Sequence, residues 1–199
     1  GQHRRATMIC LNLGSFKDII ALPHWVNIDI LPLGSRLPEN VRFIQHDLTQ
    51  GITFGDGEVE LIRASHLLEH LTLEDSHKLL AEMHRVLKPQ GIARILVPDM
   101  RFIVRMYLMS EMAYFDDIQP RKYVEAKTQG EKLSRIMFSG DYAHMACYDY
   151  PMLLEFLGQA GFSQIIRLAP GESTSQQMFE EAVPTDGHAK ESLVVEAIK

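Results

Sequence analysis

Residues 58–99, EVELIRASHLLEHLTLEDSHKLLAEMHRVLKPQGIARILVPD, decide the fold because they contain a complete strand–helix–strand unit. In residues 58–64 the apolar residues Val59, Leu61 and Ile62 stand among polar neighbours in a stretch too short for a helix, which predicts a half-buried strand. Residues 92–97 are almost continuously apolar, as in a strand covered on both faces. Between them, apolar residues from Leu79 to Leu87 recur at the spacing of one helix face. This order predicts a right-handed parallel βαβ unit.

The ends of the expected helix are marked by residues with known capping preferences. Thr72, followed by Asp75, can cap its N-terminus, because the threonine oxygen accepts a hydrogen bond from a backbone N–H that has no partner within the helix. Pro89 disfavours helical geometry at Lys88, so we expect the helix to end there. Gly91 is then expected to allow a tight turn into the second strand.

Two segments of this unit and the start of the chain carry recognisable motifs. Residues 82–91 read EMHRVLKPQG and residues 65–71 read SHLLEHL. These segments resemble the E-x-x-R-V-L-K-P-G-G motif, and the segment after strand 4, of class I S-adenosylmethionine (SAM)-dependent methyltransferases of the type 11 branch. L-N-L-G at residues 11–14 and W-V-N-I-D at residues 25–29 resemble the start of a subgroup of predicted methyltransferases. The resemblance implies one α/β domain over residues 1–199, with a Rossmann-like, doubly wound sheet of seven strands that is mostly parallel and has an antiparallel last strand.

The rest of the chain fits this plan. Residues 100–112 are expected to form a helix buried on more than one side, and residues 129–138 a second helix. Asp149 and Gly161 are the expected cap and stop of a later helix. In the family the interval 100–148 lies over the substrate pocket, so the resemblance implies a helical and loop lid there.

Composition restricts the function classes. The net charge is −6 and the pI is near 5.8, which argues against binding of nucleic acid or anionic lipid through a broad basic surface. No apolar run approaches the length of a membrane span, and no signal peptide opens the chain. Two cysteines suit a reducing compartment. We therefore expect a cytoplasmic protein without a nucleic-acid or membrane partner; its oligomeric state cannot be read from the sequence.

The resemblance implies SAM as cofactor, bound where the parallel strands end. Asp29, at the end of the second strand, is expected to accept hydrogen bonds from both ribose hydroxyls. The resemblance implies that Asp47, which follows an expected third strand at residues 41–44, binds the adenine amino group, although the same residue is also a common turn former. The cofactor-binding residues implied by the resemblance are Asn12, Gly14, Ser15, Asp29, Ile30, Asp47, Leu48, Ser65 and His66.

Two departures from the family pattern leave two functions open. Phe16 replaces the second glycine of the turn, where a side chain could intrude on the methionine part of SAM. Only residues 15–25 separate the first two strands, which leaves room for little or no helix. The chain is therefore expected to be either a SAM-dependent methyltransferase of a small molecule or a catalytically inactive protein of the same fold that binds a ligand or partner.

His66 and His144 are the candidates for catalysis. His66 directly follows the fourth strand and His144 lies in the expected lid, so either could bind the acceptor or take its proton. His144 is equally compatible with a solvent-exposed loop. His66, Glu69 and His70 formally match the H-x-x-E-H zinc motif, but that motif requires one regular helix and a third ligand downstream. Because His66 follows a strand, we expect no metal site.

Overall fold

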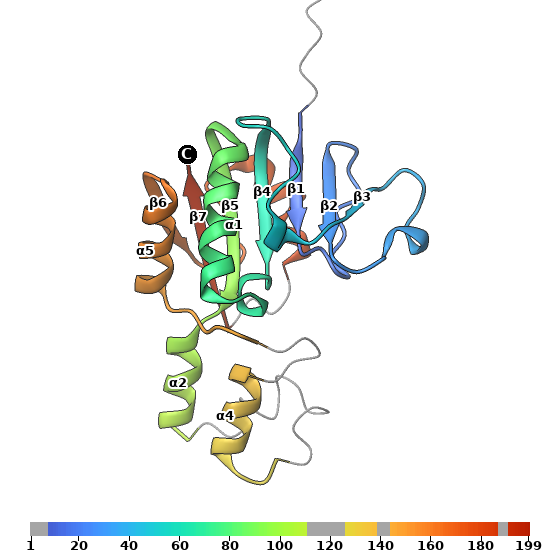
Figure 1. Cartoon of the computed structure of the whole chain (residues 1–199). Helices are drawn as coiled ribbons and strands as arrows, with labels where there is room; N and C mark the ends of the chain where they lie inside the picture. The colour runs from blue at the N-terminus through green and yellow to red at the C-terminus, as the bar shows by residue number, and fades with distance from the viewer. Residues whose placement is uncertain (1–7, 111–125, 139–143, 187–190) are drawn as a thin grey trace, which may run out of the picture.

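A computed structural model describes residues 8–110, 126–138, 144–186 and 191–199 (Figure 1). The strands are β1 (Cys10–Leu13), β2 (Trp25–Asp29), β3 (Arg42–Gln45), β4 (Val59–Ser65), β5 (Leu87–Pro98), β6 (Gln164–Leu168) and β7 (Ser192–Ile198). They form one seven-stranded sheet of order β3-β2-β1-β4-β5-β7-β6. The first five are mutually parallel and β7 runs antiparallel to both of its neighbours. The predicted fold class is confirmed.

Helices cover the sheet and extend one of its edges. The helices are α1 (Leu73–Val86), α2 (Met100–Leu108), α4 (Gln129–Phe138), α5 (Tyr150–Ala160) and α6 (Gln176–Glu181), with short 3₁₀ turns η1 (Gly34–Arg36), η2 (Leu48–Gln50), η3 (Leu68–His70) and η4 (Val183–Thr185). In Figure 1, α1 and α5 lie in front of the sheet, where the main apolar core forms. Within the described residues, no helix is long and apolar enough to cross a membrane.

The β4–α1–β5 unit confirms the predicted βαβ arrangement. The Thr72 hydroxyl accepts a hydrogen bond from the Asp75 amide at 3.1 Å, as a helix N-cap does. The turn into β5 differs from the prediction, because Gln90, with φ of 66°, takes the left-handed conformation expected of Gly91. Gly91 is needed for another reason: a Cβ there would lie 2.8 Å from the Lys88 carbonyl oxygen.

The second face of the sheet carries a row of buried polar residues. On β2, β1, β4, β5 and β7, these are Asn27, Asn12, Arg63, Arg94 and Glu196, each beside the next in register and each 0% exposed. Asp186, which follows η4, accepts hydrogen bonds from both arginines at 2.7–3.0 Å. Two cationic side chains can therefore stay buried side by side, because one carboxylate lies between them.

The helix expected over residues 100–112 is shorter and less buried than predicted. The helix α2 ends at Leu108, and Ile103 is its only fully buried residue. Figure 1 shows why: α2 and α4 extend beyond the edge of the sheet at which β5 ends, so α2 packs beside α4 and not onto the sheet. The helix α4 has the bounds predicted for it.

Candidate functional site

The carboxyl ends of four neighbouring strands form the first part of the candidate site. Because the sheet order runs β3-β2-β1-β4 and these strands are parallel, the residues after them share one edge. Gly14, Asp29, Asp47 and Ser65 therefore come to the same edge, as the sequence predicted for a cofactor site.

Gly14 forms a turn that requires glycine. Its φ is +63°, and a Cβ at this position would lie 2.9 Å from Cδ1 of Leu67. The Gly14 amide donates a hydrogen bond to the carbonyl oxygen of Ile28 at 2.8 Å. The turn is thus held against β2 from one side and contacted by the segment after β4 from the other.

Asp29 organises the loops around it. Its Oδ2 accepts a hydrogen bond from the Phe16 amide at 2.8 Å, and its Oδ1 accepts one from the Leu31 amide at 2.9 Å. A carboxylate has about four lone-pair positions, so each oxygen can still accept one further bond. Phe16 is held in the left-handed region, with φ of 39°, and its side chain is 46% exposed. Ile30, the residue between these loops, is also exposed.

Asp47 acts as a cap in the structure. Its Oδ1 accepts hydrogen bonds from the backbone amide and hydroxyl of Thr49, which begins the η2 turn and lowers the pKa of Asp47. The turn-forming role considered for this residue is therefore confirmed, while the bond to adenine stays a prediction. Leu48 beside it is buried in the core.

The Asn12 side chain is fully buried and does not reach the surface of this edge. Its Nδ2 donates to the Asp18 carbonyl and to Asn27 Oδ1, and its Oδ1 accepts from Arg63. Asn27 in turn pairs with both backbone groups of Ile20. The short β1–β2 connection, which has no helix, is thus held by two buried asparagines, and this explains the two asparagines in the LNLG and WVNID motifs.

Two buried hydroxyls at this edge have no hydrogen-bond partner within the described residues: Ser15 Oγ and Ser65 Oγ. Ser15 follows β1 and is 1% exposed, and Ser65 ends β4 and is 5% exposed. An unsatisfied buried hydroxyl is costly, so a polar ligand that bonded to it would offset that cost. The edge therefore fits a ligand with several polar groups.

A cluster of histidines lies where β4 ends. His66 adopts a left-handed φ of 51°, and its ring nitrogens lie 3.0 Å from Glu69 Oε1 and 3.0 Å from Ser192 Oγ. Since a carboxylate only accepts, Nδ1 of His66 carries the proton toward Glu69 and Nε2 faces Ser192. Glu69 is 1% exposed.

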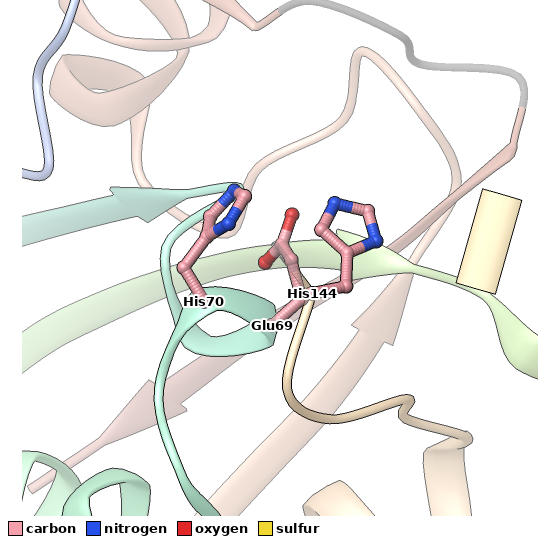
Figure 2. A group of neighbouring side chains, drawn as sticks. All are labelled: Glu69, His70 and His144. Carbon is pink, nitrogen blue, oxygen red and sulfur yellow. The ribbon is translucent and has the colours of Figure 1, made fainter. Parts of the chain in front are cut away.

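His144 joins this cluster through the backbone. The amides of Met145 and Ala146 donate to the Glu69 carbonyl oxygen at 2.7 and 3.2 Å, which brings the segment after residue 143 against η3. The ring of His144 lies 4.9 Å, centroid to centroid, from that of His70 (Figure 2). Burial lowers the pKa of His144. The two predicted catalytic histidines thus both lie close to Glu69.

A cavity of about 440 Å³ opens beside the cluster. Its lining includes Asp99, Arg167 and Ser192, the residue whose hydroxyl lies against His66. Arg167 donates to Asp99 Oδ2 at 3.2 Å, and Asp99 also caps α2 through its other oxygen. The cavity lining also includes Glu191, so one cationic side chain, two acidic side chains and one hydroxyl lie beside the carboxyl end of β5.

The sequence reasoning missed the buried residues Arg63, Arg94 and Asp186. The signal for the arginines was present, because LIRAS and IARIL each place one arginine at the centre of an apolar strand. Such a residue must be paired if both faces are covered. Asp186 gave no comparable signal.

Comparison with known proteins agrees with this geometry. A family model described as "Methyltransferase domain" matches residues 28–95. No curated protein matches the sequence. A SAM-dependent methyltransferase from Archaeoglobus fulgidus superposes with a TM-score of 0.60 at 14% identity, over 98% of this chain and 87% of that one. The corresponding values for a SAM-dependent methyltransferase from Mesorhizobium loti are 0.56, 15%, 98% and 92%.

A third similar structure contains ligands. It is the 1,6-didemethyltoxoflavin-N1-methyltransferase of Burkholderia thailandensis with bound 1,6-didemethyltoxoflavin and S-adenosylhomocysteine, with a TM-score of 0.52 at 17% identity, over 96% of this chain and 70% of that one. At these identities the likeness concerns the fold. Together with the family-model match over residues 28–95, it shows that the chain has a fold like that of SAM-dependent methyltransferases, as the sequence motifs predicted.

Proposed function

We propose that this protein is a methyltransferase that uses SAM to methylate a small molecule. The observation that carries the proposal is the polar edge formed by Gly14, Asp29, Ser15 and Ser65, where two buried hydroxyls have no partner within the described part of the chain. The match to a methyltransferase-domain model over residues 28–95 supports the same cofactor. SAM supplies an activated methyl group, so the protein's task is to hold two reactants in line.

The residues at the edge have distinct roles in this proposal. Asp29 accepts the ribose hydroxyls with the lone pairs that the Phe16 and Leu31 amides leave open. Asp47 offers the oxygen that does not cap η2 to the adenine amino group. The exposed side chain of Ile30 gives the adenine ring of the cofactor an apolar neighbour.

The remaining residues of the edge support these contacts. The Gly14 turn and the Ser15 and Ser65 hydroxyls serve the methionine part of the cofactor, and Leu48 packs beneath Asp47. Asn12 acts from within, because it fixes the connection that carries Ser15.

The acceptor is assigned to the cavity of about 440 Å³, which lies in the size range of small-molecule sites. Arg167 and Asp99 provide charges of both signs, so the acceptor we expect is polar. The Burkholderia enzyme, whose structure contains bound 1,6-didemethyltoxoflavin, is a precedent for a methyltransferase of this fold that binds such a compound. Residues 100–148 are proposed as the lid over the acceptor; residues 111–125 and 139–143 of this range lie outside the described residues, and the described part includes α2 and α4 at the same edge.

His66 is proposed as the base. The bond to Glu69 fixes the tautomer in which Nδ1 is protonated, so that Nε2 faces Ser192 at the cavity wall with its lone pair. A proton can then pass from the acceptor through the Ser192 hydroxyl to His66. His144 is proposed as a second residue that binds the acceptor.

Calorimetric titration with S-adenosylhomocysteine tests the cofactor. Asp29→Asn keeps the shape of the side chain but replaces one acceptor oxygen, so we expect at least tenfold weaker binding, about 1.4 kcal/mol. Asp56→Asn, at the exposed ion pair with Arg85, is the matched control and should bind like the wild type. No heat from the wild type at millimolar ligand would favour the alternative function, a catalytically inactive binding protein of this fold.

A further inference from the structure

Three side chains next to the proposed base lie close together, and the methyl-transfer proposal gives them no joint role. The potential ligand atoms of Glu69, His70 and His144 all lie within 4.8 Å of one another. Figure 2 shows the Glu69 carboxylate beside the two imidazole rings, with Glu69 and His70 on the η3 turn and His144 on a separate segment. Two imidazoles and one carboxylate are the ligand set of many zinc and iron enzymes.

The Glu69 carboxylate gives an independent observation that points to a ligand at this cluster. The residue is 1% exposed, and Oε1 is satisfied by His66. Its Oε2 is buried and has no hydrogen-bond partner among the residues that the structure describes. Burying a carboxylate oxygen without a hydrogen bond destabilises the folded protein. A cation bound in the cluster would offset that destabilisation.

The residues behind the cluster are arranged as they are behind bound metals. His144 Nδ1 lies 3.1 Å from the Ile136 carbonyl oxygen, so it donates its proton there and leaves Nε2 as the atom with the lone pair. Metal-binding histidines usually donate their second N–H to a carbonyl or carboxylate in this way. The two amide bonds from Met145 and Ala146 to the Glu69 carbonyl hold the segments of the two ligands together.

We infer that Glu69, His70 and His144 bind one divalent transition-metal ion of the Zn²⁺ type. Ca²⁺ and Mg²⁺ prefer sites made of oxygen atoms alone, so they fit this set poorly. Tetrahedral ligands at about 2.1 Å from zinc lie about 3.4 Å apart, so the widest pair closes by at most about 1.4 Å around the ion. Three protein ligands leave one position open, as in catalytic zinc sites.

This site differs from the H-x-x-E-H pattern considered in the sequence. That pattern would use His66 and His70 as ligands from one helix, whereas His66 is bonded to Glu69 and Ser192 and precedes the 3₁₀ turn η3. The third ligand, His144, comes from a distant segment and could not be found from local spacing. The sequence-based expectation of no metal site is replaced here by this inference.

The ion also gives the proposed reaction a second activating group. In its open position it would bind an acceptor oxygen or nitrogen and lower the pKa of that group, which favours attack on the methyl donor. This role depends on the proposed methyltransferase function, but the metal site itself does not.

Metal binding is tested first on the wild-type protein. After treatment with a chelator, titration with ZnCl₂ is expected to show one ion per chain, and CoCl₂ should give the visible absorption of four-coordinate cobalt, which Zn²⁺ removes. An equal concentration of MgCl₂ should not compete. A wild type that binds no Zn²⁺ stoichiometrically, or that loses Zn²⁺ to equimolar Mg²⁺, overturns the inference.

Variants then assign the ligands. Glu69→Gln and His144→Gln should each weaken Zn²⁺ binding at least tenfold and abolish the cobalt spectrum. His77→Ala is the matched control, since His77 lies on α1 and packs against Phe156 outside the cluster, and it should bind like the wild type. Far-UV circular dichroism checks that each variant is folded. Unchanged affinity in both ligand variants would refute the assignment.

S-adenosylhomocysteine titration of the chelated protein separates the two proposals. Binding of the nucleoside without any binding of Zn²⁺ would remove the metal site and leave the methyltransferase proposal intact. Binding of Zn²⁺ without any binding of the nucleoside would do the reverse.

Discussion

The substitution Asp186→Asn tests whether one carboxylate neutralises the two buried arginines on the second face of the sheet. The Asp186 side chain is 5% exposed and accepts bonds from Nε of Arg63 and from Nε and Nη2 of Arg94. Asparagine has nearly the same volume, so the substitution removes the charge without leaving a cavity. Arg94 keeps its ion pair with Glu196, whereas the other contacts recorded for Arg63 are neutral oxygens of Asn12 and Thr185.

The expected loss follows from the burial of these charges. Removing one partner of a buried ion pair costs about 3–5 kcal/mol, because the remaining charge stays desolvated. In a chain of this size, 1 kcal/mol shifts Tm by about 2–4 °C, so we expect Tm to fall by about 6–20 °C. Urea unfolding followed by circular dichroism measures the free energy of unfolding, and thermal unfolding measures Tm.

A surface pair provides the control. Glu74 and Lys78 form an exposed ion pair one turn apart on α1, and Glu74→Gln should leave stability unchanged within error. If Asp186→Asn changed the free energy of unfolding as little as this control does, the carboxylate would not be neutralising the arginines and our explanation of the second face of the sheet would be refuted.

Two further predictions concern the connection between β1 and β2. Gly14→Ala should destabilise the fold by about 1–3 kcal/mol because φ is +63° and the new Cβ would meet Leu67, and Leu67→Ala in the same chain should recover part of the loss; urea unfolding of both variants measures this. Asn27→Ala removes both bonds to the backbone of Ile20 and should cost about 2–3 kcal/mol, with hydrogen exchange at the Ile20 amide rising more than at Leu157; equal changes at the two amides would contradict the local role of Asn27.

Much of the fold could be predicted because its signals are local. The caps Thr72 and Asp149 and the stop at Gly161, with φ of 106°, act within a few residues of their own helices. The turn before β5 shows the limit of such signals, since Gly91 was read as the turning residue but Gln90 takes that conformation. Gly91 is also required by the Glu60 carbonyl oxygen of β4, which would lie 3.0 Å from a Cβ at this position, and the local sequence does not contain that neighbour.

The candidate site was predictable only where residues follow directly after strands. Asp29 and His66 were placed by this rule, because parallel strands bring their ends to one edge. The contact between His144 and the η3 turn could not be predicted, since it depends on backbone bonds to the Glu69 carbonyl from a segment more than seventy positions away. The exposure of α2 was missed for a similar reason: apolar residues predict a buried helix but do not reveal that it extends past the sheet.

A crystal structure of the protein soaked with saturating S-adenosylhomocysteine tests the central claim most directly. We predict nucleoside density at the carboxyl ends of β1 and β2, with the ribose hydroxyls on Asp29 and the amino acid part near Ser15 and Ser65. An empty edge, closed by Phe16 and Leu67 at saturating ligand, would contradict the assignment of this edge as the cofactor site.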